Sequence, residues 1–189
     1  MMEAIFKREV VVNKTISRII GVMAFVVLTS LGAFVRIPLP FTPVPLTLQT
    51  FFVLLSGLCL GSLGAVSQVI YVLLGITGIP IFSTAASGLY YLSGPTAGYI
   101  FGFILAALFL GKFTKESKGN LFYLFVILCL ADSIILACGT LWLKVILRIT
   151  FKKSLLIGFV PFILGDLLKI SVAASLFVRL KTRLQEIFS

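Results

Sequence analysis

Long apolar runs, separated by short polar or proline-rich segments, follow one another along nearly the whole chain. A membrane-spanning helix needs about 20 mostly apolar residues, so 189 residues with short connections have room for about six such helices. We therefore expect an all-α, polytopic membrane protein whose six transmembrane helices form one bundle. The predicted helices cover about residues 19–35, 46–60, 64–78, 94–110, 121–143 and 155–178.

Two connecting segments have unusual compositions. RIPLPFTPVPLTLQT, residues 36–50, holds four prolines within eight residues. Proline lacks a backbone donor and blocks helix formation, so this segment should be an ordered loop or a polyproline-like strand. IPIFSTAASGLYYLS, residues 79–93, is uncharged and rich in small, hydroxyl-bearing and aromatic side chains. Such a loop can line a cavity as well as connect two helices.

The composition places the chain outside the range of soluble proteins. Hydrophobic residues make up 60% of it, charged residues 12%, and the mean hydropathy is +1.19, whereas about a quarter of the residues in a soluble domain are charged. We expect one transmembrane domain over residues 1–189, embedded in the lipid bilayer of a cell membrane. No extramembrane domain remains for ATP hydrolysis or nucleic-acid binding.

The basic residues predict the orientation in the membrane. The net charge is +10, but the sixteen lysines and arginines are scattered over helix ends rather than gathered in one stripe, which favours topology over a polyanionic partner. With both termini in the cytoplasm, ten of them lie inside, five outside, and Lys169 within the membrane. Cytoplasmic segments carry the excess of positive charge, so we expect cytoplasmic termini. The basic leader, about residues 1–18, would precede a retained first helix.

The sequence does not favour a metal site or a disulfide. Its three cysteines lie in apolar runs without metal-ligand spacing, and it contains no histidine. No nucleophile–base arrangement or phosphate-binding loop is visible. We therefore expect no enzyme activity, no metal and no cofactor.

An acid and a lysine stand three residues apart in the apolar run PFILGDLLKISVAASLFV. Asp166 and Lys169 would share one helix face, and charges so deep in a membrane segment need partners or a function. They form either a structural ion pair or a polar ligand site. Pro161 and Gly165 nearby favour a local opening of the helix where a ligand could approach the backbone. Asp132 is a second buried acid, which we interpret as a carboxylate hydrogen-bonded to a neighbouring helix.

Further candidates for a ligand site come from the two unusual segments. Gly98 and Gly102 have the spacing of close helix packing, which does not explain the hydroxyls around them. Membrane-interface anchoring is an alternative for the tyrosines before that helix. The proline-rich segment is either a rigid connector or a stiff lid over a site. The candidates from these segments are Ser87, Tyr91, Thr96, Tyr99, Phe41, Thr47 and Gln49.

These patterns together resemble the biotin-specific S components of energy-coupling-factor vitamin transporters. The resemblance covers nearly the whole chain. It rests on RIPLPFTPVPLTLQTFFVLLSGLCLG (36–61), GITGIPIF (75–82), GPTAGYIFGF (94–103), GTLWL (139–143) and PFILGDLLKI (161–170).

The resemblance implies a six-helix bundle whose proline-rich loop closes over a biotin site on the outer side. It also implies that Asp166 and Lys169 contribute to that site. Biotin offers ureido N–H donors for a carboxylate, an anionic valerate for an ammonium and a flat bicyclic body for apolar walls. Which end of biotin each group holds stays open at this stage.

The implied partners are biotin, a transmembrane coupling subunit and two ATPase subunits, with a homo-oligomer as a further possibility. The family's first helix usually packs on the coupling subunit through an Ala-xxx-Ala face, whereas this chain has Met23 and Val27 there. The alternatives are an S component for another vitamin, a small proton-coupled carrier or a membrane enzyme using Asp166 and Asp132. No inverted repeat typical of secondary carriers is visible.

Overall fold

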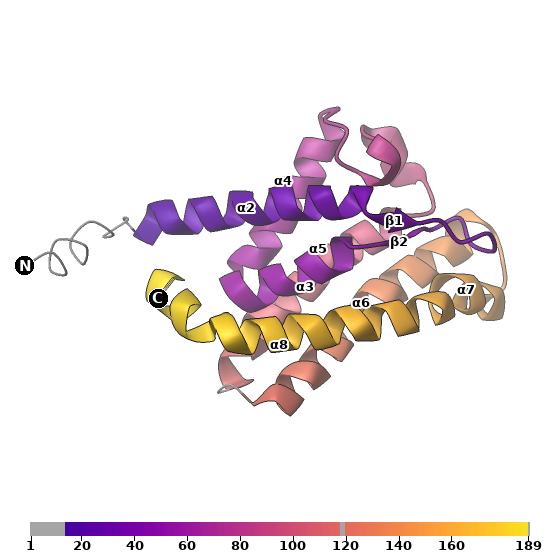
Figure 1. Ribbon diagram of the computed structural model, residues 1–189. Coiled ribbons are helices and arrows are strands. Elements are labelled where there is room, and N and C mark those ends of the chain that lie inside the picture. Colours follow the sequence, from indigo (N-terminus) through magenta and orange to yellow (C-terminus); the bar gives the residue numbers. More distant parts are fainter. Residues whose placement is uncertain (1–13, 118–119, 189) are drawn as a thin grey trace, which may run out of the picture.

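Seven α-helices and one small β-hairpin make up the part of the chain that the computed structural model describes, residues 14–117 and 120–188 (Figure 1). The predicted basic leader lies outside the described residues up to residue 13, and residues 14–18 already belong to the first helix. The helices are α2 (Lys14–Phe34), α3 (Gln49–Leu60), α4 (Leu63–Ile76), α5 (Ala97–Phe113), α6 (Leu121–Ile146), α7 (Phe151–Gly158) and α8 (Ile163–Phe188).

Six of these helices form the bundle that the sequence predicts, and α7 is an additional short helix. Four segments are long and apolar enough to cross a membrane, over residues 14–34, 97–117, 121–146 and 151–180. Helices α3 and α4 have 12 and 14 residues, which at 1.5 Å per residue is only about 18 and 21 Å. They form a hairpin whose turn at Gly61 packs against Gly111, near the end of α5.

Glycines bring the central helices into close contact. An added Cβ at Gly98 would lie 2.6 Å from the carbonyl oxygen of Cys138, and one at Gly102 would lie 2.8 Å from Cα of Ile135. The predicted role of both glycines in packing is thus confirmed, because α5 and α6 approach each other backbone to backbone. Gly57 does the same for α3 and α5. Small residues are the usual means of helix association in lipid.

The proline-rich segment folds into a short hairpin. Strand β1 (Arg36–Ile37) pairs antiparallel with β2 (Leu46–Thr47), and Arg36 lies opposite Thr47. The intervening residues contain all four prolines, so they supply few backbone donors and cannot extend the ladder. The prediction of a non-helical, ordered segment is confirmed, although its paired part is a β-hairpin and not a polyproline-like strand.

The prediction of one continuous sixth helix is wrong. Helix α7 ends at Gly158, a 3₁₀ turn follows over Val160–Phe162, and α8 begins at Ile163. Pro161 accounts for the break, because it lacks an N–H and restricts the residue before it. The expected local opening near Pro161 is therefore a complete interruption, and it puts Asp166 in the first turn of α8.

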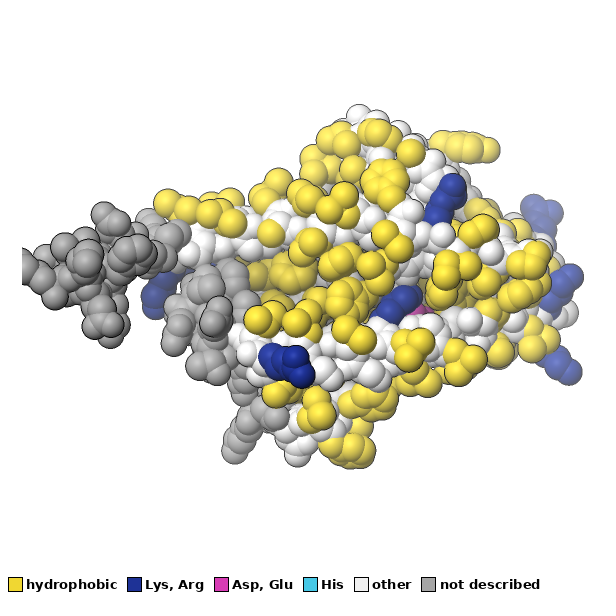
Figure 2. Space-filling model, in the orientation of Figure 1, with side chains coloured by type: hydrophobic (Ala, Val, Ile, Leu, Met, Phe, Trp, Pro, Cys, Tyr) yellow, Lys and Arg dark blue, Asp and Glu magenta, His cyan; other side chains and the backbone are white. Residues whose placement is uncertain are grey.

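The hairpin and the two ends of the described chain lie at opposite ends of the bundle. Figure 1 shows the start of α2 and the end of α8 on one side, and β1, β2 and α7 on the other. Hydrophobic side chains are spread over the face drawn in Figure 2, and lysines and arginines lie mainly toward its ends. This distribution is that of a multi-pass membrane protein with an apolar belt between two polar ends.

The contact of α3 with α5 provides a test of this packing. We expect Gly57→Val to lower the unfolding temperature in detergent, because an added Cβ would lie 2.7 Å from that of Leu110 and 3.0 Å from the carbonyl oxygen of Ala107. Overpacking of this kind costs about 1–3 kcal/mol. Ala24→Val on the exposed face of α2 is the matched control and should leave the unfolding temperature unchanged. Equal unfolding temperatures for the two variants would contradict the close contact.

Candidate functional site

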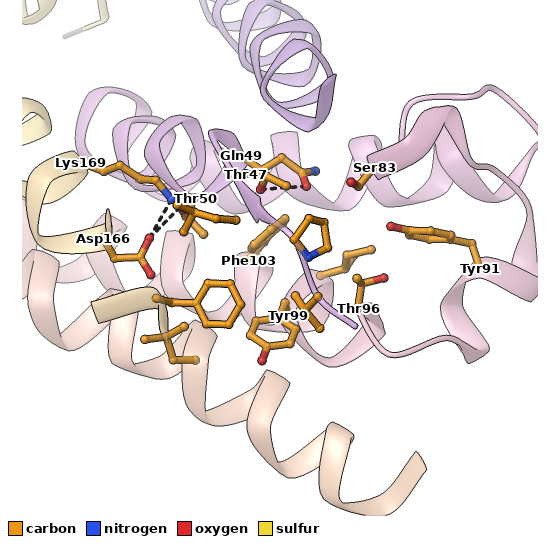
Figure 3. Close-up of a pocket in the computed structure, with 16 residues that line it drawn as sticks. Thr47, Gln49, Thr50, Ser83, Tyr91, Thr96, Tyr99, Phe103, Asp166 and Lys169 are labelled. Atoms are coloured by element: carbon orange, nitrogen blue, oxygen red, sulfur yellow. Dashed lines mark hydrogen bonds and ion pairs between the residues drawn. The ribbon is translucent and has the colours of Figure 1, made fainter. Parts of the chain in front are cut away.

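A small cavity lies inside the end of the bundle that carries the hairpin (Figure 3). Its volume is about 40 Å³, room for only a few water molecules. A second cavity of about 240 Å³ adjoins it and shares four of its residues, Pro45, Ser83, Tyr91 and Thr96. The first cavity is lined by Val44, Pro45, Leu46, Thr47, Gln49, Thr50, Ser83, Tyr91, Thr96, Tyr99, Ile100, Phe103, Leu136, Phe162, Asp166 and Lys169.

An ion pair stands at one end of this cavity. The ammonium nitrogen of Lys169 lies 2.8 Å from Oδ1 of Asp166 and 2.9 Å from Oγ1 of Thr50. The Thr50 hydroxyl in turn donates to Oδ1 of Asp166 at 3.4 Å. Asp166 is 3% exposed, so the carboxylate depends on these two donors in place of water. The ion pair that the spacing predicts is present within α8, and its hydrogen bonds with Thr50 connect α8 to α3.

The helix break positions the carboxylate. Asp166 lies in the first turn of α8, where the partial positive charge of a helix N-terminus stabilises an anion. Lys169 follows one turn later on the same face. The turn of Val160–Phe162 also brings the ring of Phe162 to the cavity wall. One proline-induced interruption therefore places both a polar and an apolar part of the lining.

Gln49 belongs to a chain of hydrogen bonds along the cavity wall. Its amide nitrogen donates to the Tyr71 hydroxyl at 2.6 Å, and its amide oxygen accepts from the Thr47 hydroxyl at 3.4 Å. The Tyr71 hydroxyl donates onward to the carbonyl oxygen of Ile81 at 3.2 Å. These hydrogen bonds connect the hairpin to α3, to α4 and to the loop after α4, so they fix the side of the cavity that faces the hairpin.

Hydroxyl groups gather at the other end. Figure 3 shows Ser83 and Tyr91 at the end opposite Asp166 and Lys169, with Thr96 beside them. The Ser83 side chain is 4% exposed, and its Oγ has no hydrogen-bond partner in the described chain. Burial raises the pKa of Tyr91 above its usual value, so its hydroxyl remains a donor at neutral pH. The nearby hydroxyls of Thr96 and Ser83, and to a smaller extent the positive charge of Arg36, oppose this rise in the pKa of Tyr91.

The hydroxyl of Tyr99 serves the fold. It donates to the carbonyl oxygen of Gly158 at 2.6 Å, at the end of α7, and only the ring contributes to the cavity wall. The ring also packs where a Cβ on Gly139 would lie. The indole of Trp142 has a similar function, because its Nε1 donates to the carbonyl oxygen of Gly94 at 2.8 Å. These two bonds hold the helix ends around the cavity.

The structure brings together most of the predicted site residues but not all of them. Phe41 is 59% exposed near the tip of the hairpin, and neither Phe41 nor Ser87 lines either cavity. The remaining seven do line the first cavity, and their role in binding stays a prediction. They are Asp166, Lys169, Tyr99, Tyr91, Thr96, Gln49 and Thr47.

The sequence interpretation missed two polar lining residues, Thr50 and Ser83. Thr50 directly follows Gln49 at the end of the proline-rich segment, and Ser83 belongs to the hydroxyl-rich loop of residues 79–93. The composition of residues 79–93 predicts that this loop lines a cavity, but it does not indicate which of the hydroxyls point inward.

Comparisons with known proteins show the family of the chain. The sequence matches the profile of the BioY family over residues 6–186. The chain belongs to the BioY family. The BioY relatives include the biotin transporter BioY of Thermotoga maritima, 41% identical over 83% of this chain and 91% of that protein. They also include the probable biotin transporter BioY of Pyrococcus horikoshii, 40% identical over 85% and 93%.

The fold of a BioY protein is also found in a solved structure. The 2.1 Å crystal structure of an S-component for biotin from an ECF-type ABC transporter superposes with a TM-score of 0.85 and covers 90% of this chain and 94% of that one. The two sequences are 24% identical, so the match shows the fold. Membership of the BioY family also confirms that the chain is a transporter component and not an enzyme.

The buried pair leads to a prediction for stability. We expect Asp166→Leu to destabilise the protein by up to about 3–5 kcal/mol, because it leaves the Lys169 ammonium without its counter-charge. Adding Lys169→Met in the same chain should recover most of that loss. The measurement is thermal unfolding in detergent without ligand. A double variant as unstable as Asp166→Leu alone would show that lost packing, and not the unpaired charge, causes the effect.

Proposed function

We propose that this chain is a biotin-binding S component that mediates biotin uptake and binds the vitamin between the hairpin, α3, α5 and α8. The observation that carries the proposal is the Lys169–Asp166–Thr50 group at the end of an otherwise mostly apolar cavity, in a member of the BioY family. Biotin has a polar ring system at one end, an apolar body and an anion at the other end, which matches this sequence of surfaces.

The ureido ring belongs at the ion pair. Asp166 can accept its N–H groups, and the third N–H of Lys169 can donate to its carbonyl oxygen. The valerate anion does not belong there, because it would lie next to a carboxylate that is only 3% exposed. The neutral ureido group therefore leaves the charge balance of the pair unchanged.

The valerate carboxylate then belongs at the hydroxyl end. Ser83, Tyr91 and Thr96 offer hydroxyl donors, and the unpartnered Oγ of Ser83 would gain an acceptor. Arg36 adds a positive potential near Tyr91. The rings of Phe103 and Phe162 are available for the apolar body between the two ends.

Ligand entry requires the lid to move. A cavity of about 40 Å³ is too small for biotin, and the adjoining cavity of about 240 Å³ shares the lining residues Pro45, Ser83, Tyr91 and Thr96 with it. The hairpin contributes four residues to the inner lining, so its displacement would join the two spaces. The prolines limit the conformations of this lid and lower the entropy lost when it closes.

Transport needs an external source of energy. The partners in this proposal are a transmembrane coupling subunit and two ATPase subunits of an ECF module. With both termini in the cytoplasm, the hairpin end and the cavity lie at the outer surface (Figure 1). Met23 and Val27 are 44% and 53% exposed on α2, so this face is available to the coupling subunit although it lacks the usual alanines.

The ion pair yields the first binding prediction. Lys169→Met should weaken the binding of biotin and of biotin methyl ester equally, by about 1.5–3 kcal/mol, because each loses one charged hydrogen bond to the ureido oxygen. The measurement is equilibrium binding to the purified chain in detergent. A loss confined to biotin would instead place its carboxylate at Lys169. Binding of riboflavin or thiamine in preference to biotin would refute the proposed ligand.

The hydroxyl end yields the complementary prediction. Tyr91→Phe should weaken the binding of biotin by about 1.5–3 kcal/mol and that of the methyl ester by less, because only the carboxylate accepts a charge-assisted hydrogen bond there. Tyr123→Phe is the matched control, since Tyr123 lines neither cavity and its hydroxyl bonds to Phe113 and Glu116. Equal losses for acid and ester would place the carboxylate elsewhere.

A further inference from the structure

Two features near the proposed biotin site have no part in the binding described above. One is Asp132 of α6, which lines neither cavity. Its Oδ1 has no hydrogen-bond partner in the described chain, so the expected bond to a neighbouring helix is not found at that atom. The other feature is the second cavity, called the outer cavity from here on. It adjoins the site directly, and it is the feature that bears on the ligand.

The outer cavity begins at the hydroxyl end of the inner one. Its volume is about 240 Å³, against about 40 Å³ for the inner cavity. The boundary between them includes Ser83, Tyr91 and Thr96, the hydroxyls at the end opposite the ion pair (Figure 3). The outer cavity therefore continues from the place where the proposed function puts the carboxylate of biotin. The residues that line only the outer cavity are Pro43, Thr84, Tyr90, Gly94 and Pro95.

One wall of the outer cavity is an ordered turn in the loop after α4. The backbone N–H of Phe82 donates to the carbonyl oxygen of Ala86 at 3.0 Å, and the Phe82 ring stacks on the Tyr91 ring with centroids 4.9 Å apart. Thr84 and Ala85, inside this turn, have φ values of 69° and 54°, left-handed conformations that residues with a Cβ adopt only at a cost in energy. The surrounding contacts hold them there, so this wall is formed before a ligand arrives, which limits the entropy lost on binding.

The lining of the outer cavity suits an uncharged group. In the part of the chain that the structure describes, no charged side chain lines it. The rings of Pro43 and Pro45 come from the hairpin, and the ring of Tyr90 from the loop. Tyr90 is 91% exposed, so its ring has apolar area left to cover a ligand. Apolar and aromatic walls of this kind bind an apolar substituent and offer nothing to a second charge.

The hydroxyls at the boundary can bind an amide as well as a carboxylate. A hydroxyl both donates and accepts hydrogen bonds, whereas an ammonium or a guanidinium only donates. Ser83, Tyr91 and Thr96 can therefore donate to the oxygen of an amide and accept from its N–H. The buried Oγ of Ser83 has no partner in the described chain, so it is available for either group. Recognition at this end does not require a free carboxylate.

We propose that the site also binds amides of biotin, in which the carboxyl group of the vitamin is joined to an amine. The ureido ring stays at Asp166 and Lys169, the amide group lies at the boundary hydroxyls, and the substituent on the amide nitrogen occupies the outer cavity against Tyr90. This inference rests on the proposed biotin site and extends its ligand class from the free vitamin to carboxyl-linked forms. Tyr90 is then a residue that distinguishes among substituents.

The experiment compares two amides of biotin, the N-methylamide and the N-benzylamide, by equilibrium binding to the purified full chain in detergent, with biotin beside them. Both amides lack the carboxylate charge, so its loss cancels when they are compared. The methyl group is too small to reach far into the outer cavity, whereas the benzyl ring can pack on Tyr90. We expect the benzylamide to bind about two- to tenfold more tightly than the methylamide.

Two variants test where the substituent lies. In Tyr90→Ala the benzylamide should lose its advantage, so that the two amides bind alike. Leu89→Ala is the matched control, because Leu89 is a neighbouring side chain that is 67% exposed and lines neither cavity. This control should retain the full advantage of the benzylamide. Both changes are at exposed positions, so neither removes a buried contact.

The outcomes separate this inference from the proposed function. A benzylamide that binds the unmodified chain no more tightly than the methylamide overturns the inference, and this comparison needs no variant. An advantage that persists in Tyr90→Ala shows that the substituent lies elsewhere and overturns it too. Tight binding of biotin with no binding of either amide also rejects the inference and leaves the proposed function intact. A folded chain that binds neither biotin nor its amides would instead refute the proposed function.

Discussion

A carboxylate and an ammonium can remain inside a membrane protein only where each meets the hydrogen-bonding needs of the other. In this chain that condition is met by Asp166, Lys169 and Thr50. The helix break at Pro161 sets Asp166 in the first turn of α8, and the end of the hairpin sets Thr50 in the first turn of α3. The geometry of the cavity depends on this three-membered contact between helices distant in the sequence.

The remaining polar side chains of the site extend the same principle along the cavity wall. The hydrogen bonds from Thr47 through Gln49 to Tyr71 give each of these groups a partner and link the hairpin to α3 and α4. The hydroxyl end differs, because the buried Oγ of Ser83 has no hydrogen-bond partner in the part of the chain that the structure describes. At the ion-pair end the polar groups have hydrogen-bond partners, whereas the hydroxyl end offers donors without an acceptor. Such a site favours a ligand whose negatively charged group lies at the hydroxyl end.

Much of the fold could be predicted from the sequence because apolar length and glycine spacing are local signals. The spacing of Gly98 and Gly102 predicts close helix packing, which the structure shows between α5 and α6, and Pro161 predicts an opening near Asp166. The direction in which a hydroxyl points depends on contacts with segments distant in the sequence, so local sequence patterns do not give it. Tyr99 was predicted for its hydroxyl, which bonds to Gly158, while Thr50 became a site residue only through its contact with α8.

The single tryptophan of the chain holds a segment beside the cavity. Trp142 donates its indole N–H to Gly94, two residues before the lining residue Thr96. Any rearrangement that moves this segment changes the polarity and hydrogen bonding around the indole. The protein therefore contains an intrinsic fluorophore at the edge of its own cavity, and its emission follows the state of that edge without an attached label.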